Sequence, residues 1–167
     1  MDTMDWERRL ALLWAAIDER PEDEFVTAME ALVAELPDDD PIGPFEHASA
    51  LDSTGHPDLA VGGYRQALAG GLSGQRRRRA VIQLASSLRN LGRAEESVAL
   101  LTAELDAASD DLDDAVRGFL ALAMASVGRE REAVAMALAA LAPHLTRYNR
   151  SLAAYARQIV ADGARAE

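Results

Sequence analysis

The chain has 167 residues and a formal net charge of −11, and its 17 basic residues are all arginine. An acidic balance of this size argues against nucleic-acid binding, because nucleic-acid binders need a basic surface to neutralise phosphates. The absence of cysteine excludes disulfides, thiolate metal sites and cysteine nucleophiles. No apolar run approaches the roughly 20 residues of a membrane span, so we expect no membrane interaction. The acidic start MDTMDWERRL lacks the apolar core of a secretory signal, and we therefore expect a cytoplasmic protein.

The first part of the chain has the spacing of two amphipathic helices. Apolar residues recur three, four and seven positions apart, as on one buried helix face. In the first helix they are Leu10, Leu13, Trp14 and Ile17, and in the second they are Phe25, Met29, Leu32 and Leu36. Pro21 suits the start of the second helix because its fixed φ matches a first turn. We predict a helix pair over residues 5–36, ended by the Pro37–Pro41 connector.

Three later stretches repeat one another, namely ASALDSTGHPDLAVGGYRQAL (48–68), ASSLRNLGRAEESVALLTAEL (85–105) and ALAMASVGREREAVAMALAAL (121–141). Their glycines Gly55, Gly92 and Gly128 lie at nearly equal intervals, which is typical of stacked helical repeats. Each glycine falls where a helix must end in a left-handed turn. We predict helix pairs over 42–71, 75–107 and 111–142 and a terminal helix over 145–165. No segment alternates like a strand, so the predicted fold is a single all-α domain over 1–167.

Each repeat carries the same pattern of small and large residues around its glycine. Seven positions before it stand Ala48, Ala85 and Ala121, and four before it stand Leu51, Leu88 and Met124. Five positions after it stand Ala60, Ser97 and Ala133. In this pattern the chain resembles the tetratricopeptide repeat (TPR) family, in a divergent form similar to the short bacterial type. Two departures are Glu104, where alanine is usual, and Ala137, where an aromatic residue is usual.

The resemblance implies a right-handed superhelical array of antiparallel helix pairs, with residues 5–36 as a degenerate first pair. About four pairs and a C-terminal capping helix are expected. It also implies a concave groove lined by the first helix of each pair, which binds a peptide or protein segment without a cofactor. By this resemblance the groove residues are Phe45, Ser49, Asp52, Arg79, Ile82, Ser86, Arg89 and Asn90. The lysine-based grip on acidic tails found in some members is not expected, since the chain has no lysine.

The only dense basic run is Arg76-Arg77-Arg78-Arg79. One interpretation is a solvated face paired with neighbouring acids. The other is a contact for an acidic partner segment, because arginine grips carboxylates with two parallel hydrogen bonds. The sequence leaves both open.

No motif for catalysis or metal binding stands out. The histidines His47, His56 and His144 are scattered and do not have metal-ligand spacing. Gly62-Gly63 lies inside a predicted helix and fits close helix approach better than phosphate binding. We therefore expect a non-enzymatic protein-binding module. The alternative is a self-associating scaffold protein, such as a homodimer, whose groove or end is filled by another copy.

Overall fold

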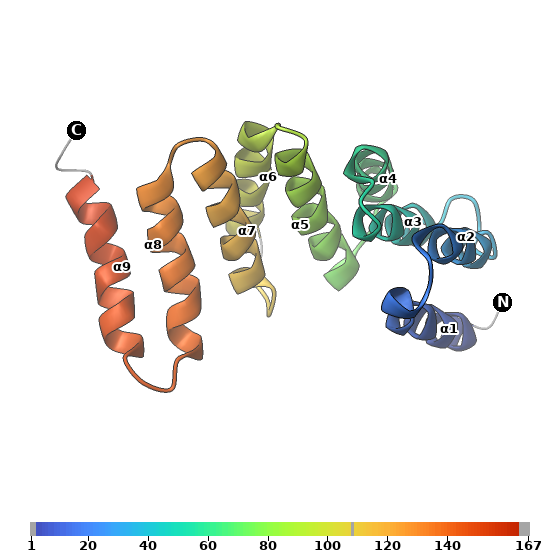
Figure 1. Cartoon of the computed structure of the whole chain (residues 1–167), viewed down its shortest axis with the longest axis horizontal. Helices are drawn as coiled ribbons and strands as arrows, with labels where there is room; N and C mark the ends of the chain where they lie inside the picture. Colours follow the sequence, from blue (N-terminus) through green and yellow to red (C-terminus); the bar gives the residue numbers. More distant parts are fainter. Residues whose placement is uncertain (1–2, 108, 164–167) are drawn as a thin grey trace. The chain divides into compact units, whose positions relative to one another are not determined.

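A computed structural model describes residues 3–107 and 109–163, and it is all-α over this part of the chain (Figure 1). The predicted fold class is confirmed. The helices are α1 (Thr3–Ala15), α2 (Glu22–Val33), α3 (Ile42–Ser53), α4 (Pro57–Ala69), α5 (Gly74–Asn90), α6 (Ala94–Ala107), α7 (Asp113–Ser126), α8 (Glu130–Leu141) and α9 (Asn149–Gly163). Two short 3-10 helices, Ile17–Glu19 and Ala142–His144, lie between them. None of the described helices is long and apolar enough to cross a membrane.

The three repeat glycines end α3, α5 and α7 in the same way. Gly55, Gly92 and Gly128 have φ angles of 83°, 77° and 77°, which only glycine adopts without strain. The residue after each glycine donates its backbone N–H to the carbonyl five positions earlier, at 2.9 Å in all three turns. This hydrogen bond closes the end of the first helix, and the second helix of the pair then runs antiparallel to it. The three glycines that repeat in the sequence therefore form the same turn in the structure.

The last helix starts later than the sequence indicates. Residues 142–144 form a 3-10 turn after α8, and Leu145 is then extended. Tyr148 has a left-handed φ of 67°, so α9 begins only at Asn149. A left-handed φ is uncommon outside glycine, so a tyrosine at this position gives no sequence signal for a break. The spacing of apolar residues therefore did not predict where α9 begins.

The chain divides into two compact units, Met1–Ser87 and Leu88–Glu167, and α5 crosses the boundary between them. In the first unit the α1–α2 pair buries Trp6, Leu10, Phe25, Met29 and Leu32. The Trp6 Nε1 donates to the Leu32 carbonyl at 2.9 Å, so the largest core side chain has its polar atom satisfied. The predicted degenerate first pair is thus a packed helix pair.

Close approach between α3 and α4 depends on a missing side chain. A Cβ on Gly63 would lie 2.9 Å from the Ala48 Cβ and 3.0 Å from the Pro44 carbonyl oxygen. Gly62, by contrast, has nothing within 4 Å of its Cβ position. Gly63 therefore meets the expectation of close helix approach, and Gly62 does not.

The second unit packs α6 to α9 in sequence order, with α7 between α6 and α8 and with α9 against α8 (Figure 1). Its buried side chains include Leu101, Val116 and Leu120. The last helix buries Ala156 while Arg150 and Arg157 stay exposed. Tyr155 and Val160 on the same helix are also exposed, at 61% and 53%, so the outer face of α9 is only partly the polar cap that the end of a helical array requires.

We predict that Leu88→Asp strongly destabilises the protein, whereas Ser86→Asp does not. Leu88 is buried and Ser86 is only partly buried. Burying an unpaired carboxylate costs several kcal/mol, which is comparable with the stability of a domain. Urea unfolding followed by circular dichroism at 222 nm measures both variants. Equal losses would show that the two faces of α5 are assigned wrongly.

Candidate functional site

The structure separates the eight predicted groove residues into buried and exposed groups. In the first unit, Phe45 and Ser49 are 0% exposed and Ile82 is buried as well. These three side chains, which the resemblance places in the groove, therefore offer almost no surface to a partner. The Phe45 ring packs against Tyr64, with ring centroids 6.3 Å apart, and Ser49 donates to the Phe45 carbonyl at 2.9 Å. These side chains pack below the surface of this face and support the residues that are exposed on it.

Arg79 is the exposed cation of this face. Its guanidinium carbon lies 5.3 Å from the centroid of the Phe45 ring, which is within cation–π range. It has no carboxylate partner among residues 3–107 and 109–163. A pocket of about 480 Å³ opens beside it, lined also by Ile42, Leu72 and Ser73. The side chain is therefore held in place by an aromatic ring while its hydrogen-bond donors remain available.

Asp52 belongs to a polar network rather than standing free. Its carboxylate accepts hydrogen bonds from Ser87 Oγ at 3.0 Å and from the Tyr64 hydroxyl at 3.3 Å. Burial raises the pKa of Asp52 above its ordinary value, and the two hydrogen bonds partly oppose this rise. Burial and the Asp52 charge also raise the pKa of Tyr64, so the phenol stays protonated and donates. This network joins α3, α4 and α5 within the first unit.

Arg76 has a structural role that the sequence did not reveal. It donates to the Glu46 carboxylate at 3.0 Å and grips Glu7 through two bonds of 2.9 and 2.6 Å. Glu46 is only 1% exposed, and its other oxygen accepts from Trp14 Nε1 at 3.0 Å. A buried carboxylate needs such partners because it has lost water. Arg77 and Arg78 also have interaction partners, and Arg78 is buried.

Comparison with known proteins agrees with this geometry. A family model described as "Tetratrico peptide repeat" matches residues 41–159, which is more than half of the chain. The chain belongs to the tetratricopeptide repeat family. No curated protein and no solved structure matches it in the same comparisons. The match begins just before α3, so it leaves out the α1–α2 pair of this TPR protein.

In the second unit the predicted TPR groove residues are Arg89 and Asn90. Asn90 is exposed and Arg89 is partly buried. The Arg89 guanidinium donates to the Asn90 side-chain oxygen at 2.8 Å, and its Nε has no hydrogen-bond partner in the described structure. The remaining predicted residue, Ser86, is partly exposed in the first unit.

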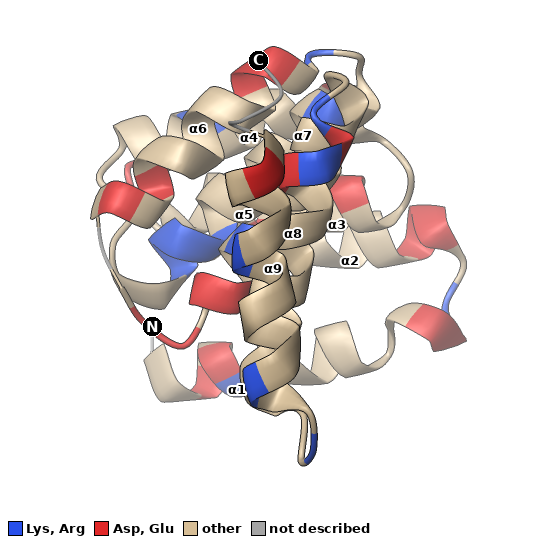
Figure 2. Cartoon of the chain, turned by 90° about the vertical axis from the view of Figure 1, so that its left-hand side faces the viewer, with Lys and Arg blue, Asp and Glu red and all other residues tan. Residues whose placement is uncertain are grey.

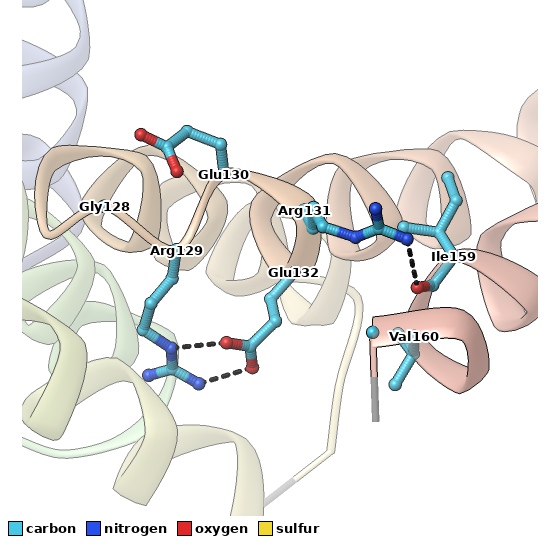
Figure 3. Close-up of a pocket in the computed structure, with 8 residues that line it drawn as sticks. Gly128, Arg129, Glu130, Arg131, Glu132, Ile159 and Val160 are labelled. Carbon is cyan, nitrogen blue, oxygen red and sulfur yellow. Dashed lines mark hydrogen bonds and ion pairs between the residues drawn. The ribbon is translucent and has the colours of Figure 1, made fainter. Parts of the chain in front are cut away.

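The TPR units contain no cluster of three or more potential metal ligands among their described residues. In the second unit, a pocket of about 450 Å³ lies between the start of α8 and the end of α9 (Figure 3). Its arginines are already engaged. Arg129 pairs with Glu132 through bonds of 2.7 and 2.6 Å, and Arg131 lies 3.5 Å from the Ile159 carbonyl. The hydrogen-bonding capacity of Arg129 is therefore already used by Glu132, whereas Arg131 makes only one long bond.

We predict that Arg76→Met lowers the free energy of unfolding by about 1–3 kcal/mol, since it leaves the buried Glu46 charge with Trp14 alone. Urea titration at neutral pH provides the measurement. The control is Arg8→Met, whose pair with Asp5 is exposed to solvent and should therefore contribute much less. Adding Glu46→Gln to the Arg76→Met variant should recover part of the loss. Equal effects of Arg76→Met and Arg8→Met would contradict the structural role.

A second prediction concerns pH. Because burial raises the folded-state pKa of Asp52 above its ordinary value, the protonated carboxyl stabilises the fold. That contribution is fully present below the unfolded-state pKa and is lost as pH rises through the folded-state pKa. Asp52→Asn lacks this loss, and its amide oxygen can still accept from Ser87 Oγ while its amide N–H donates to the Tyr64 hydroxyl.

The stability of Asp52→Asn relative to the unsubstituted protein should therefore increase with pH across this window and then level off. Urea unfolding at a series of pH values from acidic to neutral gives the difference. Asp39→Asn, at an exposed position in the connector, is the control. A difference that does not change with pH would rule out a raised pKa at Asp52.

Proposed function

We propose that this TPR protein is a non-enzymatic, cytoplasmic interaction module. It binds a peptide or protein segment on the face of its first helices and presents Arg79 to an acidic residue of the partner. The observation that carries the proposal is the state of Arg79. This guanidinium is exposed, stacked over Phe45 and free of any carboxylate partner in the described structure, beside a pocket.

The contrast with Arg76 supports this assignment. Both arginines line the same pocket, but Arg76 is already paired with Glu7 and Glu46. The two interpretations of the arginine run therefore apply to different residues. Arg76 pairs with acids of its own chain, and Arg79 has the donors that a partner carboxylate needs. In the second unit we propose the same role for Arg89, whose side chain is partly exposed and has no carboxylate partner in the described structure.

Self-association is a second candidate, and a specific observation favours it. On α1, Met4 is 82% exposed and Leu12 is 60% exposed. They are eight positions apart and so share one face of the helix. Exposed apolar side chains that share a face are typical of contact surfaces. Light scattering with size-exclusion chromatography tests this candidate, because a stable dimer should dissociate in a Leu12→Glu variant.

We predict that Arg79→Ala weakens binding of acidic peptides by about 1–3 kcal/mol and leaves the fold intact. A fluorescently labelled library of acidic and neutral peptides supplies the ligands, and anisotropy at two salt concentrations gives the affinities. Arg20→Ala removes the same charge at an exposed site away from this face and is the matched control. Binding should also weaken as salt rises, since exposed charges are screened. Unchanged affinity in Arg79→Ala would remove the basis of the proposal.

A further inference from the structure

A second groove lies on the first unit, away from the face of the first helices. The second helices of the first two pairs, α2 and α4, border it together with the end of α3. Its volume is about 670 Å³. The binding face proposed above lies on α3 and α5, so this groove is a separate surface with residues of its own.

Three apolar side chains line this α2–α4 groove, together with Thr27 and His56. Leu59, near the start of α4, is 58% exposed, and Val26 and Leu51 beside it are partly covered. A large apolar side chain in a concave surface releases water when a ligand covers it. The groove therefore has a place for an apolar side chain of a partner.

The rim of the groove is acidic. Glu22 and Asp23 line it at the start of α2, and Glu30 lines it two turns further along. Figure 2 marks acidic residues in red, including those of α2. Glu22 and Asp23 have no cationic partner in the described part of the chain, and Glu30 approaches only the His47 ring, at 3.3 Å.

The helix dipole accounts for only part of this charge. Carboxylates in a first turn stabilise a helix, and Glu22, Asp23 and Glu24 all lie there. The effect fades within one turn, so it does not explain Glu30. Nor does it explain why Leu59, which lines the same groove, is exposed.

We propose that the α2–α4 groove binds a basic, apolar peptide segment of a partner protein. An apolar side chain of the partner covers Leu59, Leu51 and Val26. Arginine or lysine on either side of it pairs with Glu22 and Asp23 at one end and with Glu30 at the other. Asp23 and Glu30 are about two helical turns apart, or about 10 Å, which an extended segment spans in three or four residues. The ligand pattern is thus a basic residue, a short apolar stretch and a second basic residue.

The test uses the intact protein and three labelled synthetic peptides, GRALRG, GRASRG and GEALEG. Anisotropy should show the tightest binding for GRALRG. The groove variant combines Glu22→Gln, Asp23→Asn and Glu30→Gln. Its matched control combines Asp18→Asn, Glu24→Gln and Asp39→Asn. These substitutions also remove three negative charges, at exposed positions of the same unit that do not line the groove. Circular dichroism checks that both variants fold.

We expect the groove variant to bind GRALRG about tenfold or more weakly, and the control variant to bind it within about twofold of the unsubstituted protein. Leu59→Ser should weaken binding of GRALRG but not of GRASRG. Because Arg79 does not line this groove, Arg79→Ala should weaken binding of acidic peptides while leaving the affinity for GRALRG within about twofold, which separates this groove from the face proposed above. Equal losses of affinity for GRALRG in the two triple variants would show that only the net charge of the protein matters, which would overturn the proposal. It would also be overturned by no binding of GRALRG, or by self-association of the protein that the groove variant alone abolishes.

Discussion

The first unit depends on the buried carboxylate of Glu46. A charge withdrawn from water is tolerated only when its oxygens are paired, and here they take donors from Trp14 on α1 and from Arg76 on α5. Glu46 itself lies on α3. One side chain thus links three helices that are distant in sequence. Because Arg76 also grips Glu7, the α1–α2 pair is connected to the repeats by charge as well as by its apolar core.

This constraint also divides the arginine run by function. A guanidinium that neutralises a buried acid is not available to a partner, and this describes Arg76. One turn further along α5, Arg79 rests on the Phe45 ring, a contact that positions the cation and leaves its donors unused. The two surfaces proposed for the first unit therefore differ in charge. The face of the first helices offers a cation over an aromatic ring, whereas the α2–α4 groove offers carboxylates around a leucine.

Much of the fold could be predicted from the sequence because the repeat is carried by local rules. Gly55, Gly92 and Gly128 take a left-handed φ that follows from their position after a helix, and the small residues beside them permit close packing. The site was harder to predict. Helical periodicity correctly placed Phe45 and Ser49 on one face, but it does not tell whether neighbouring helices close over that face. Arg76 and Arg79 look alike in sequence, and what separates them is pairing with residues 30 and 69 positions away. Such long-range pairs leave no local pattern.

Side-chain NMR of the arginine Nε–H groups tests this division most directly. Single substitutions assign the resonances of Arg76 and Arg79, and the signals are then followed as an acidic peptide is added. We expect the Arg76 Nε–H to exchange slowly with water and to keep its chemical shift, because it donates to Glu46. The Arg79 Nε–H should exchange quickly in the free protein and shift as the peptide binds. Rapid exchange at Arg76, or a peptide-induced shift at Arg76 without one at Arg79, would contradict the account.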